Sequence, residues 1–241
     1  MLDPGSDPAV CTVSYRMARM LILGVFVVGV FGAPRILRAQ DPDPTRFAEQ
    51  IEAFQEADRA DPPPEGAVLF VGSSSIRMWS NLDEDFPEVR AVNRGFGGSQ
   101  FSDLLYYLEE LVLTYRPRQI FVYEGDNDVA AGKSPEEIYE DYRTFVRRVR
   151  AELPDAEIGF IAIKPSPSRW ELAPEMRAAN RLIRQHTLWR EDLEYVDVFT
   201  PMLASDGRPR PEIFRADELH MNRAGYRLWR GLIAPYVTAG R

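Results

Sequence analysis

The stretch Ala67-Val-Leu-Phe-Val-Gly-Ser-Ser-Ser-Ile-Arg-Met-Trp79 decides the fold of this chain. Its first five residues are apolar and uncharged, which is typical of a central parallel strand that is buried on both faces. Gly72 ends the apolar run, and three serines follow it directly. Because open α/β sheets bind their ligands at the carboxyl ends of the strands, these serines are expected at a ligand-binding edge.

Two interpretations of Ser73, Ser74 and Ser75 are open. A serine commonly caps the helix that follows a strand, and such a role would be purely structural. A serine hydroxyl at this edge is also a candidate nucleophile, provided that a base can take its proton. The run of three serines is compatible with both interpretations, so the choice between a cap and a nucleophile depends on other stretches of the chain.

The rest of the chain repeats a strand-and-helix pattern. Five apolar stretches are predicted as strands, at residues 67–71, 89–92, 119–123, 158–163 and 195–198. Helical periodicity predicts helices over residues 47–59, 101–112, 134–149 and 174–189 and after Asn222. The alternation predicts a parallel sheet with helices on both faces, that is, a single three-layer α/β domain.

The first forty residues differ from the rest of the chain. Two arginines precede thirteen uncharged residues, 21–33, a length that suits the apolar core of a signal peptide better than a full membrane span. We therefore expect residues 1–40 to be a signal peptide or an N-terminal anchor with an upstream extension. The protein is then exported, periplasmic or extracellular, and a membrane tether would run through residues 20–33. Residues 41–66 are expected to be a linker and N-terminal helix, and residues 67–241 the α/β domain.

Composition excludes several classes of function. The chain has 29 Lys plus Arg and 37 Asp plus Glu, a net charge of −8, and its first forty residues carry +2. The remainder therefore carries −10 and is a poor nucleic-acid binder, because phosphate contacts supply most of that affinity. Cys11 is the only cysteine, which excludes a disulfide framework and a cysteine-based metal site. Of the two histidines, His186 falls on the apolar stripe of its helix, which favours a structural role, and leaves His220 for chemistry.

Four loops are expected to meet at the carboxyl edge of the sheet. They carry the serine cluster, the glycines of Gly95-Phe-Gly-Gly98, the amide of Asn127, and the pair Asp217 and His220. Acyl transfer needs these groups, because a histidine takes the proton of a serine nucleophile and a carboxylate orients the histidine. Backbone N–H groups and an asparagine amide can hold the oxyanion of the tetrahedral intermediate.

The same stretches resemble the sequence blocks of the SGNH hydrolases, also called GDSL-type esterases and lipases. The matching blocks are Gly72-Ser-Ser74, Gly95-Phe-Gly-Gly98, Gly125-Asp-Asn-Asp128 and Asp217-Glu-Leu-His220. The resemblance spans about residues 67 to 236 and implies a flavodoxin-like SGNH hydrolase fold with strand order 2-1-3-4-5. The sequence departs from the family at Ser73, where the family usually has aspartate.

The resemblance also implies roles for individual residues. Ser74 would be the nucleophile, and its N–H would form the oxyanion hole with Gly98 and the amide of Asn127. His220 would be the base, and Asp217 would orient it. Four further side chains near the edge are candidates for the substrate site, with a packing role equally open: Arg77, Tyr123, Arg169 and Trp170.

The activity implied is that of a serine esterase that hydrolyses short-chain acyl esters, acetyl esters among them, on a small molecule or carbohydrate. No metal or cofactor is expected. The alternatives are a lipase or lysophospholipase, an acyltransferase with the same triad, and a non-catalytic carbohydrate-binding module on the same fold. The complete set of Ser74, His220 and Asp217 argues against the binding module. Hydrolysis and transfer differ only in the acceptor that reaches the acyl-enzyme, and the sequence predicts neither that acceptor nor the oligomeric state.

Overall fold

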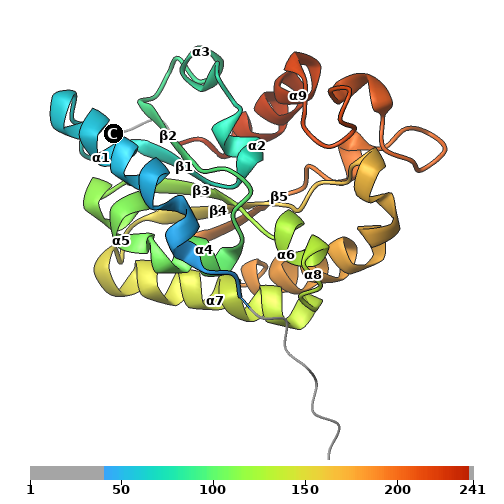
Figure 1. Cartoon of the computed structure of the whole chain (residues 1–241), viewed down its shortest axis with the longest axis horizontal. Coiled ribbons are helices and arrows are strands. Elements are labelled where there is room, and N and C mark those ends of the chain that lie inside the picture. The colour runs from blue at the N-terminus through green and yellow to red at the C-terminus, as the bar shows by residue number, and fades with distance from the viewer. Residues whose placement is uncertain (1–40, 239–241) are drawn as a thin grey trace, which may run out of the picture. The chain divides into compact units, whose positions relative to one another are not determined.

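The computed structural model describes residues 41–238, and the predicted signal peptide or anchor lies outside them. The sheet contains five parallel strands: β1 (Val68–Gly72), β2 (Ala91–Gly95), β3 (Gln119–Tyr123), β4 (Glu157–Ile161) and β5 (Leu193–Val196). Their order is β2-β1-β3-β4-β5 (Figure 1). The predicted α/β class and the strand order implied by the family resemblance are both confirmed.

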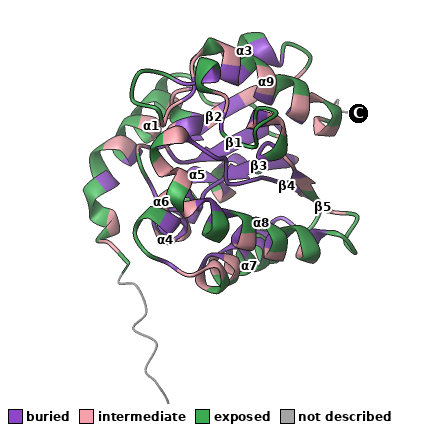
Figure 2. Cartoon of the chain, turned by 90° about the vertical axis from the view of Figure 1, so that its right-hand side faces the viewer, coloured by how far each residue is buried: buried purple, intermediate pink, exposed green. Residues whose placement is uncertain are grey.

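Helices cover both faces of the sheet, which Figure 2 shows as a buried layer between them. One face carries α1 (Ala48–Ala60), α4 (Phe101–Tyr106), α5 (Leu108–Leu111), α7 (Pro135–Glu152) and α8 (Ala173–Thr187). The other carries α2 (Ser74–Arg77), α3 (Leu82–Asp85) and α9 (Arg223–Ile233). The short helix α6 (Asp126–Ala130) follows β3 directly.

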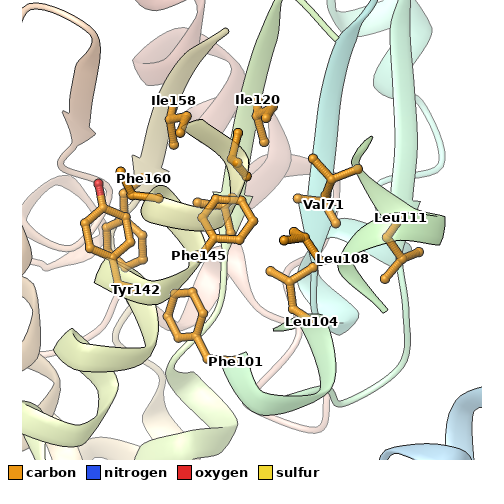
Figure 3. Packing of buried hydrophobic residues seen from close by; sticks show 14 of the residues in the cluster. Val71, Phe101, Leu104, Leu108, Leu111, Ile120, Tyr142, Phe145, Ile158 and Phe160 are labelled. Atoms are coloured by element: carbon orange, nitrogen blue, oxygen red, sulfur yellow. The ribbon is translucent and has the colours of Figure 1, made fainter. Parts of the chain in front are cut away.

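Strand side chains alternate between the two faces and build a separate core on each. Val71 and Ile120 point toward the α4, α5 and α7 side, where Leu104 packs with them (Figure 3). Phe70 points to the opposite face and stacks on Phe121, with 5.0 Å between ring centroids. Burial on both faces explains why β1 appears in the sequence as an uninterrupted apolar run.

Three neighbouring strands, β2, β1 and β3, end at the same level. Gly72 pairs in register with Gly95 of β2 and with Tyr123 of β3. The loops that follow these strands therefore leave the sheet next to one another. This carboxyl edge is where the sequence predicts the functional groups.

Several boundaries differ from the prediction. β2 runs on to Gly95 although the apolar signal stops at Val92. Asn93 continues the strand because its Nδ2 donates to a backbone carbonyl of α2 at 2.8 Å and its Oδ1 accepts the Gly95 N–H at 2.9 Å. The helix expected over residues 101–112 breaks at Tyr107 into α4 and α5, and β4 and β5 each end two residues earlier than predicted.

The N-terminal helix packs against the sheet and reaches the glycine loop. Phe47 lies edge-on to Phe96, with 5.1 Å between ring centroids. Gln50 on α1 accepts a hydrogen bond from the Gly97 N–H at 3.1 Å through its Oε1. Within residues 41–238, no helix has the length and apolar character needed to cross a lipid bilayer.

Candidate active site

The turn from β1 into α2 is built so that one of the three serines faces outward. Gly72 has a φ of 134°, and a Cβ there would lie 2.0 Å from the Tyr123 carbonyl oxygen, so only glycine fits. Ser73 and Ser75 are only 2% and 3% exposed, whereas Ser74 is half-buried at the first position of α2. The fold therefore presents Ser74 at the edge and buries its two neighbours.

A hydrogen-bonded relay joins Ser74 to a distant loop. His220 Nε2 lies 3.0 Å from Ser74 Oγ, although the two residues are 146 positions apart in the chain. His220 Nδ1 lies 2.7 Å from Asp217 Oδ2. With the imidazole neutral and its proton on Nδ1, Nε2 offers a lone pair to the serine hydroxyl.

Asp217 also shapes the turn that carries the histidine. Its Oδ1 accepts the N–H groups of Leu219 and His220 at 3.0 and 2.9 Å. Glu218, between Asp217 and Leu219, takes a left-handed conformation with φ 56°. The hydrogen bond from the His220 ring, followed by these two N–H groups, holds the pKa of Asp217 well below its usual range. The carboxylate therefore stays ionised, ready to hold the Nδ1 proton.

Ser168 supports the same turn from the loop after β4. Its N–H and its hydroxyl both donate to the carbonyl of Glu218, at 3.1 and 3.0 Å. On the other side of the turn, Asn222 caps α9 by accepting the Ala224 N–H at 2.8 Å. The histidine is thus held between two anchored segments.

The glycine loop and α6 bring further donors to this edge. Gly98 is exposed and has a φ of 77°, which favours glycine. Asn127 lies in the first turn of α6, half-buried, and its Nδ2 donates to the Ser99 carbonyl at 2.9 Å. Gly95 cannot carry a side chain, because a Cβ would lie 2.1 Å from the backbone nitrogen of Arg77. The close contact brings the glycine loop against the helix that begins with Ser74.

The four substrate-site candidates have different surroundings. Arg77 is exposed, and a Cβ on Gly97 would lie 3.2 Å from its Nε, so its side chain runs along the glycine loop. Tyr123 is fully buried against Trp229, with 5.0 Å between ring centroids, which corresponds to the packing alternative and not to a substrate contact. Trp170 is half-buried and packs on the α7–α8 side of the core.

Arg169, the fourth candidate, is engaged by the protein itself. Its Nη1 donates to Asp126 Oδ1 at 2.8 Å and to Asn127 Oδ1 at 3.1 Å. His186 lies away from this network and is half-buried on α8, where its Nδ1 is 3.2 Å from the Tyr139 hydroxyl. Its surroundings match the structural role expected for it.

Buried acids behind the glycine loop were not anticipated from the sequence. Ser99 donates its hydroxyl to Glu124 Oε1 at 2.5 Å, and both residues are fully buried. Burial, and then the nearby carboxylate of Asp128, raise the pKa of Glu124 well above its usual range. Burial also raises the pKa of Asp128 to about 6, against the opposing charge of Lys133. The signal available in the sequence was the position of Glu124, directly after the apolar stretch 119–123 and before the Gly-Asp-Asn-Asp block.

The chain matches the model of the GDSL-like lipase/acylhydrolase family over residues 65–228. That segment covers more than half of the 241 residues and contains all four sequence blocks. A search of curated proteins finds no match.

Solved structures share the fold at low sequence identity. A GDSL-like lipase from Bacteroides thetaiotaomicron superposes with a TM-score of 0.68 and 18% identity, covering 77% of this chain and 96% of that one. A lipase/acylhydrolase from Enterococcus faecalis superposes with a TM-score of 0.58 and 18% identity, covering 73% of this chain and 99% of that one. A catalytic mutant of Axe2, an acetylxylan esterase from Geobacillus stearothermophilus, superposes with a TM-score of 0.58 and 17% identity, covering 71% of this chain and 94% of that one. With the family match, these findings show that the chain belongs to the GDSL-like lipase/acylhydrolase family.

Proposed function

We propose that this protein is a serine esterase that hydrolyses short-chain acyl esters through an acyl-enzyme on Ser74. The observation that carries the proposal is the relay from Ser74 Oγ to His220 Nε2 at 3.0 Å and from His220 Nδ1 to Asp217 Oδ2 at 2.7 Å. This order of contacts supports Ser74 as the proposed nucleophile, His220 as the proposed base and Asp217 as the proposed orienting carboxylate.

In the first half-reaction, Ser74 Oγ attacks the ester carbonyl carbon while His220 Nε2 takes the hydroxyl proton. The carbonyl oxygen becomes an oxyanion, for which the N–H groups of Ser74 and Gly98 and the amide of Asn127 are the proposed donors. Collapse of this intermediate breaks the bond to the alcohol oxygen, and the imidazolium returns its proton to the departing alcohol.

In the second half-reaction, water attacks the acyl carbon of the Ser74 ester while His220 takes one of its protons. The second tetrahedral intermediate releases the carboxylic acid and returns the proton to Ser74 Oγ, so no atom or charge is left over. Each oxyanion donor is worth about 3–4 kcal/mol of barrier in hydrolases of this chemistry. Asn127→Ala is therefore expected to lower kcat by roughly 100- to 1000-fold.

Labelling with a fluorophosphonate identifies the nucleophile directly. Wild type, Ser73→Ala and Ser75→Ala should be labelled, whereas Ser74→Ala should not, and p-nitrophenyl acetate turnover should follow the same pattern with or without a chelator. The two neighbouring serines are matched controls because both are buried and differ from Ser74 by one position. Labelling that persists in Ser74→Ala contradicts the proposal.

We propose a small acyl group, such as acetyl, on a small-molecule or carbohydrate ester. The shared fold with an acetylxylan esterase supports testing acetyl esters first, although the two chains are only 17% identical. A series of p-nitrophenyl esters from acetyl to palmitoyl should give kcat/KM values that fall as the chain lengthens. A preference for long chains would favour a lipase or lysophospholipase, and product formation only with an added alcohol would favour an acyltransferase.

We also propose that the protein is exported, on the strength of the uncharged stretch 21–33 behind two arginines. Cell fractionation and N-terminal sequencing of the full chain should find it outside the cytoplasm, either shortened near residue 40 or retained at a membrane. Recovery of the full-length chain from the cytoplasm would contradict export.

A further inference from the structure

Three oxygens from a single turn of the protein accept hydrogen bonds from the guanidinium of Arg169. Its Nη1 donates to the Asp126 carbonyl at 3.1 Å, to Asp126 Oδ1 at 2.8 Å and to Asn127 Oδ1 at 3.1 Å. The Arg169 side chain is 21% exposed, and the Asp126 side chain is 7% exposed. Lys164 holds the other oxygen of the Asp126 carboxylate, with 3.1 Å between Nζ and Oδ2.

The two cations in this cluster, Lys164 and Arg169, favour the ionised form of Asp126. Burial opposes ionisation of the carboxyl, but Lys164 and then Arg169 outweigh burial and lower its pKa. Asp126 therefore anchors the guanidinium of Arg169 as a charge-assisted partner. The contact to Asn127 comes from a side chain that is already held in place.

This contact determines which way the Asn127 amide points. A guanidinium can only donate hydrogen bonds, and the Ser99 carbonyl, 2.9 Å from Asn127 Nδ2, can only accept them. Both partners are satisfied only when Oδ1 faces Arg169 and Nδ2 faces Ser99. The flipped amide would set an NH2 group against a cation and an oxygen against a carbonyl.

The orientation leaves one donor available. Asn127 Nδ2 carries two hydrogens, and the Ser99 carbonyl takes one of them. The second hydrogen is then free for a substrate oxygen at the edge where Ser74 lies. In a protein without Arg169, rotation of the Asn127 amide would break one hydrogen bond fewer than in wild type. Some of the molecules would then present Oδ1 to the oxyanion in place of Nδ2.

We propose that Arg169 is a positioning residue that fixes the Asn127 amide with its N–H toward the oxyanion, and that it acts through Asn127 and not on the substrate. The inference rests on the proposed esterase function. It replaces the direct substrate contact that was one of the two interpretations of Arg169 in the sequence.

The segment that carries Arg169 is anchored at both ends, as a positioning role requires. At its start, Asn180 on α8 accepts the Ile163 N–H at 2.8 Å and donates to the Ile163 carbonyl at 2.9 Å. Next to Arg169, Ser168 donates twice to the carbonyl of Glu218 in the histidine turn. The segment therefore links the turn of Asn127 to the turn of His220.

A double-mutant cycle separates this role from the alternatives. Arg169→Met should lower kcat for p-nitrophenyl acetate by roughly 10- to 100-fold with KM changed less than about threefold, since misplacing one oxyanion donor costs about that much. In the Asn127→Ala background, the same substitution should change kcat by less than about twofold, because its target is gone.

Two further variants serve as controls. Lys164→Met removes the other cation from Asp126 but does not touch Asn127, so its effect should be smaller than that of Arg169→Met. Arg177→Met removes an arginine that stacks on Phe199 at 4.2 Å and, within residues 41–238, makes no hydrogen bond to Asn127, so it should leave kcat unchanged. If Arg169→Met folds poorly, Arg169→Lys keeps the charge beside Asp126 and should show the same non-additivity with a smaller loss.

The NMR signals of the Asn127 side-chain NH2 group provide a readout that needs no turnover. They are identified by their loss in Asn127→Ala, and in Arg169→Met they should move and exchange faster with solvent. Unmoved signals, a fully additive double mutant, or a loss confined to KM would each overturn the inference. An inactive wild type with normal NMR behaviour would instead count against the proposed esterase function, so the two failures are distinguishable.

Discussion

Replacing Asp217 with asparagine tests the relay at its most specific point. Asparagine keeps an Oδ1 that can accept the N–H groups of Leu219 and His220, so the turn is preserved. It places an NH2 group where Oδ2 lies, 2.7 Å from His220 Nδ1. Because that NH2 group can only donate, Nδ1 must become the acceptor and the ring proton must move to Nε2.

The magnitude follows from the contacts of the ring. Within residues 41–238, Asp217 is the one acceptor found for His220 Nδ1, so no backbone carbonyl can restore the productive tautomer. In serine hydrolases with a buried carboxylate, this change lowers kcat about 10⁴-fold. The Asp217 side chain is 48% exposed, so water can partly replace it, and we expect a loss of roughly 10²- to 10³-fold, or about 3–4 kcal/mol in the barrier.

The assay is the rate of p-nitrophenol release under single-turnover conditions, together with the midpoint of thermal unfolding. Asp217→Asn should lose roughly 10²- to 10³-fold in acylation rate, less than His220→Ala, while its stability stays close to that of wild type. Asp217→Ala should lose the turn as well and unfold more easily by about 1 kcal/mol, the net value of ordinary hydrogen bonds. An Asp217→Asn variant within about threefold of wild-type kcat would refute this account of the relay.

Four other substitutions test the rest of the structure. Asp128→Asn removes a group whose pKa rises from 3.8 to about 6 on folding, so stabilisation present below pH 3.8 is lost as the pH rises through 6. Wild-type stability relative to the variant should therefore fall by roughly 3 kcal/mol between about pH 4 and about pH 7 in urea titrations; a constant difference would contradict this. Gly95→Ala should destabilise the fold by roughly 3 kcal/mol through its clash with the α2 backbone, whereas Gly231→Ala, with nothing within 4 Å, should stabilise α9 by about 0.5–1 kcal/mol, both measured by thermal unfolding. His186→Ala should leave kcat unchanged and cost roughly 1–2 kcal/mol of stability, because a hydrogen bond to the Tyr139 hydroxyl and edge-on ring contacts with Tyr139 and Tyr142 are lost; an inactive but folded variant would contradict the assignment of His220 as the base.

The parts of the site that could be predicted are those encoded locally. The apolar runs and the helical periods predict the order of strands and helices, since burial on both faces leaves a continuous signal in the sequence. Asp217 and His220 are three positions apart, so one short turn suffices to bring the carboxylate to the ring. The pattern of residues does not distinguish the three serines, and only the family resemblance points to Ser74. In the structure, the direction in which the chain leaves Gly72 buries Ser73 and Ser75 and leaves Ser74 half-buried.

The direction of the Tyr123 side chain follows from a local rule. Side chains alternate along a strand, and Val122 faces the α4–α7 side, so Tyr123 must point to the side of α9. There Trp229 covers it. Its place at the end of β3 suggested a contact with substrate, but the alternation assigns it to the face that α9 covers, and the covering helix buries it.

Other contacts of the site have no local signature. Gln50 binds the Gly97 N–H from 47 positions away, and Arg169 binds Asn127 from 42 positions away. Each is an ordinary polar residue on a helix or loop, and its role depends on how distant segments dock. Sequence pattern could place Arg169 near the edge, but it could not tell whether its guanidinium faces substrate or protein.

The sheet edge and the side-chain hydrogen bonds contribute different degrees of precision to the site. Parallel strands that end in register make the loops after them neighbours. This brings the functional side chains to one edge of the sheet but does not orient them. Hydrogen bonds between loops orient the side chains. Ser168 donates to the Glu218 carbonyl and Arg169 donates to Asn127 Oδ1, and both residues belong to one segment after β4. A substitution that shifts this segment should therefore disturb the proposed base, His220, and the proposed oxyanion donor, Asn127, together, although it touches neither Ser74 nor a substrate.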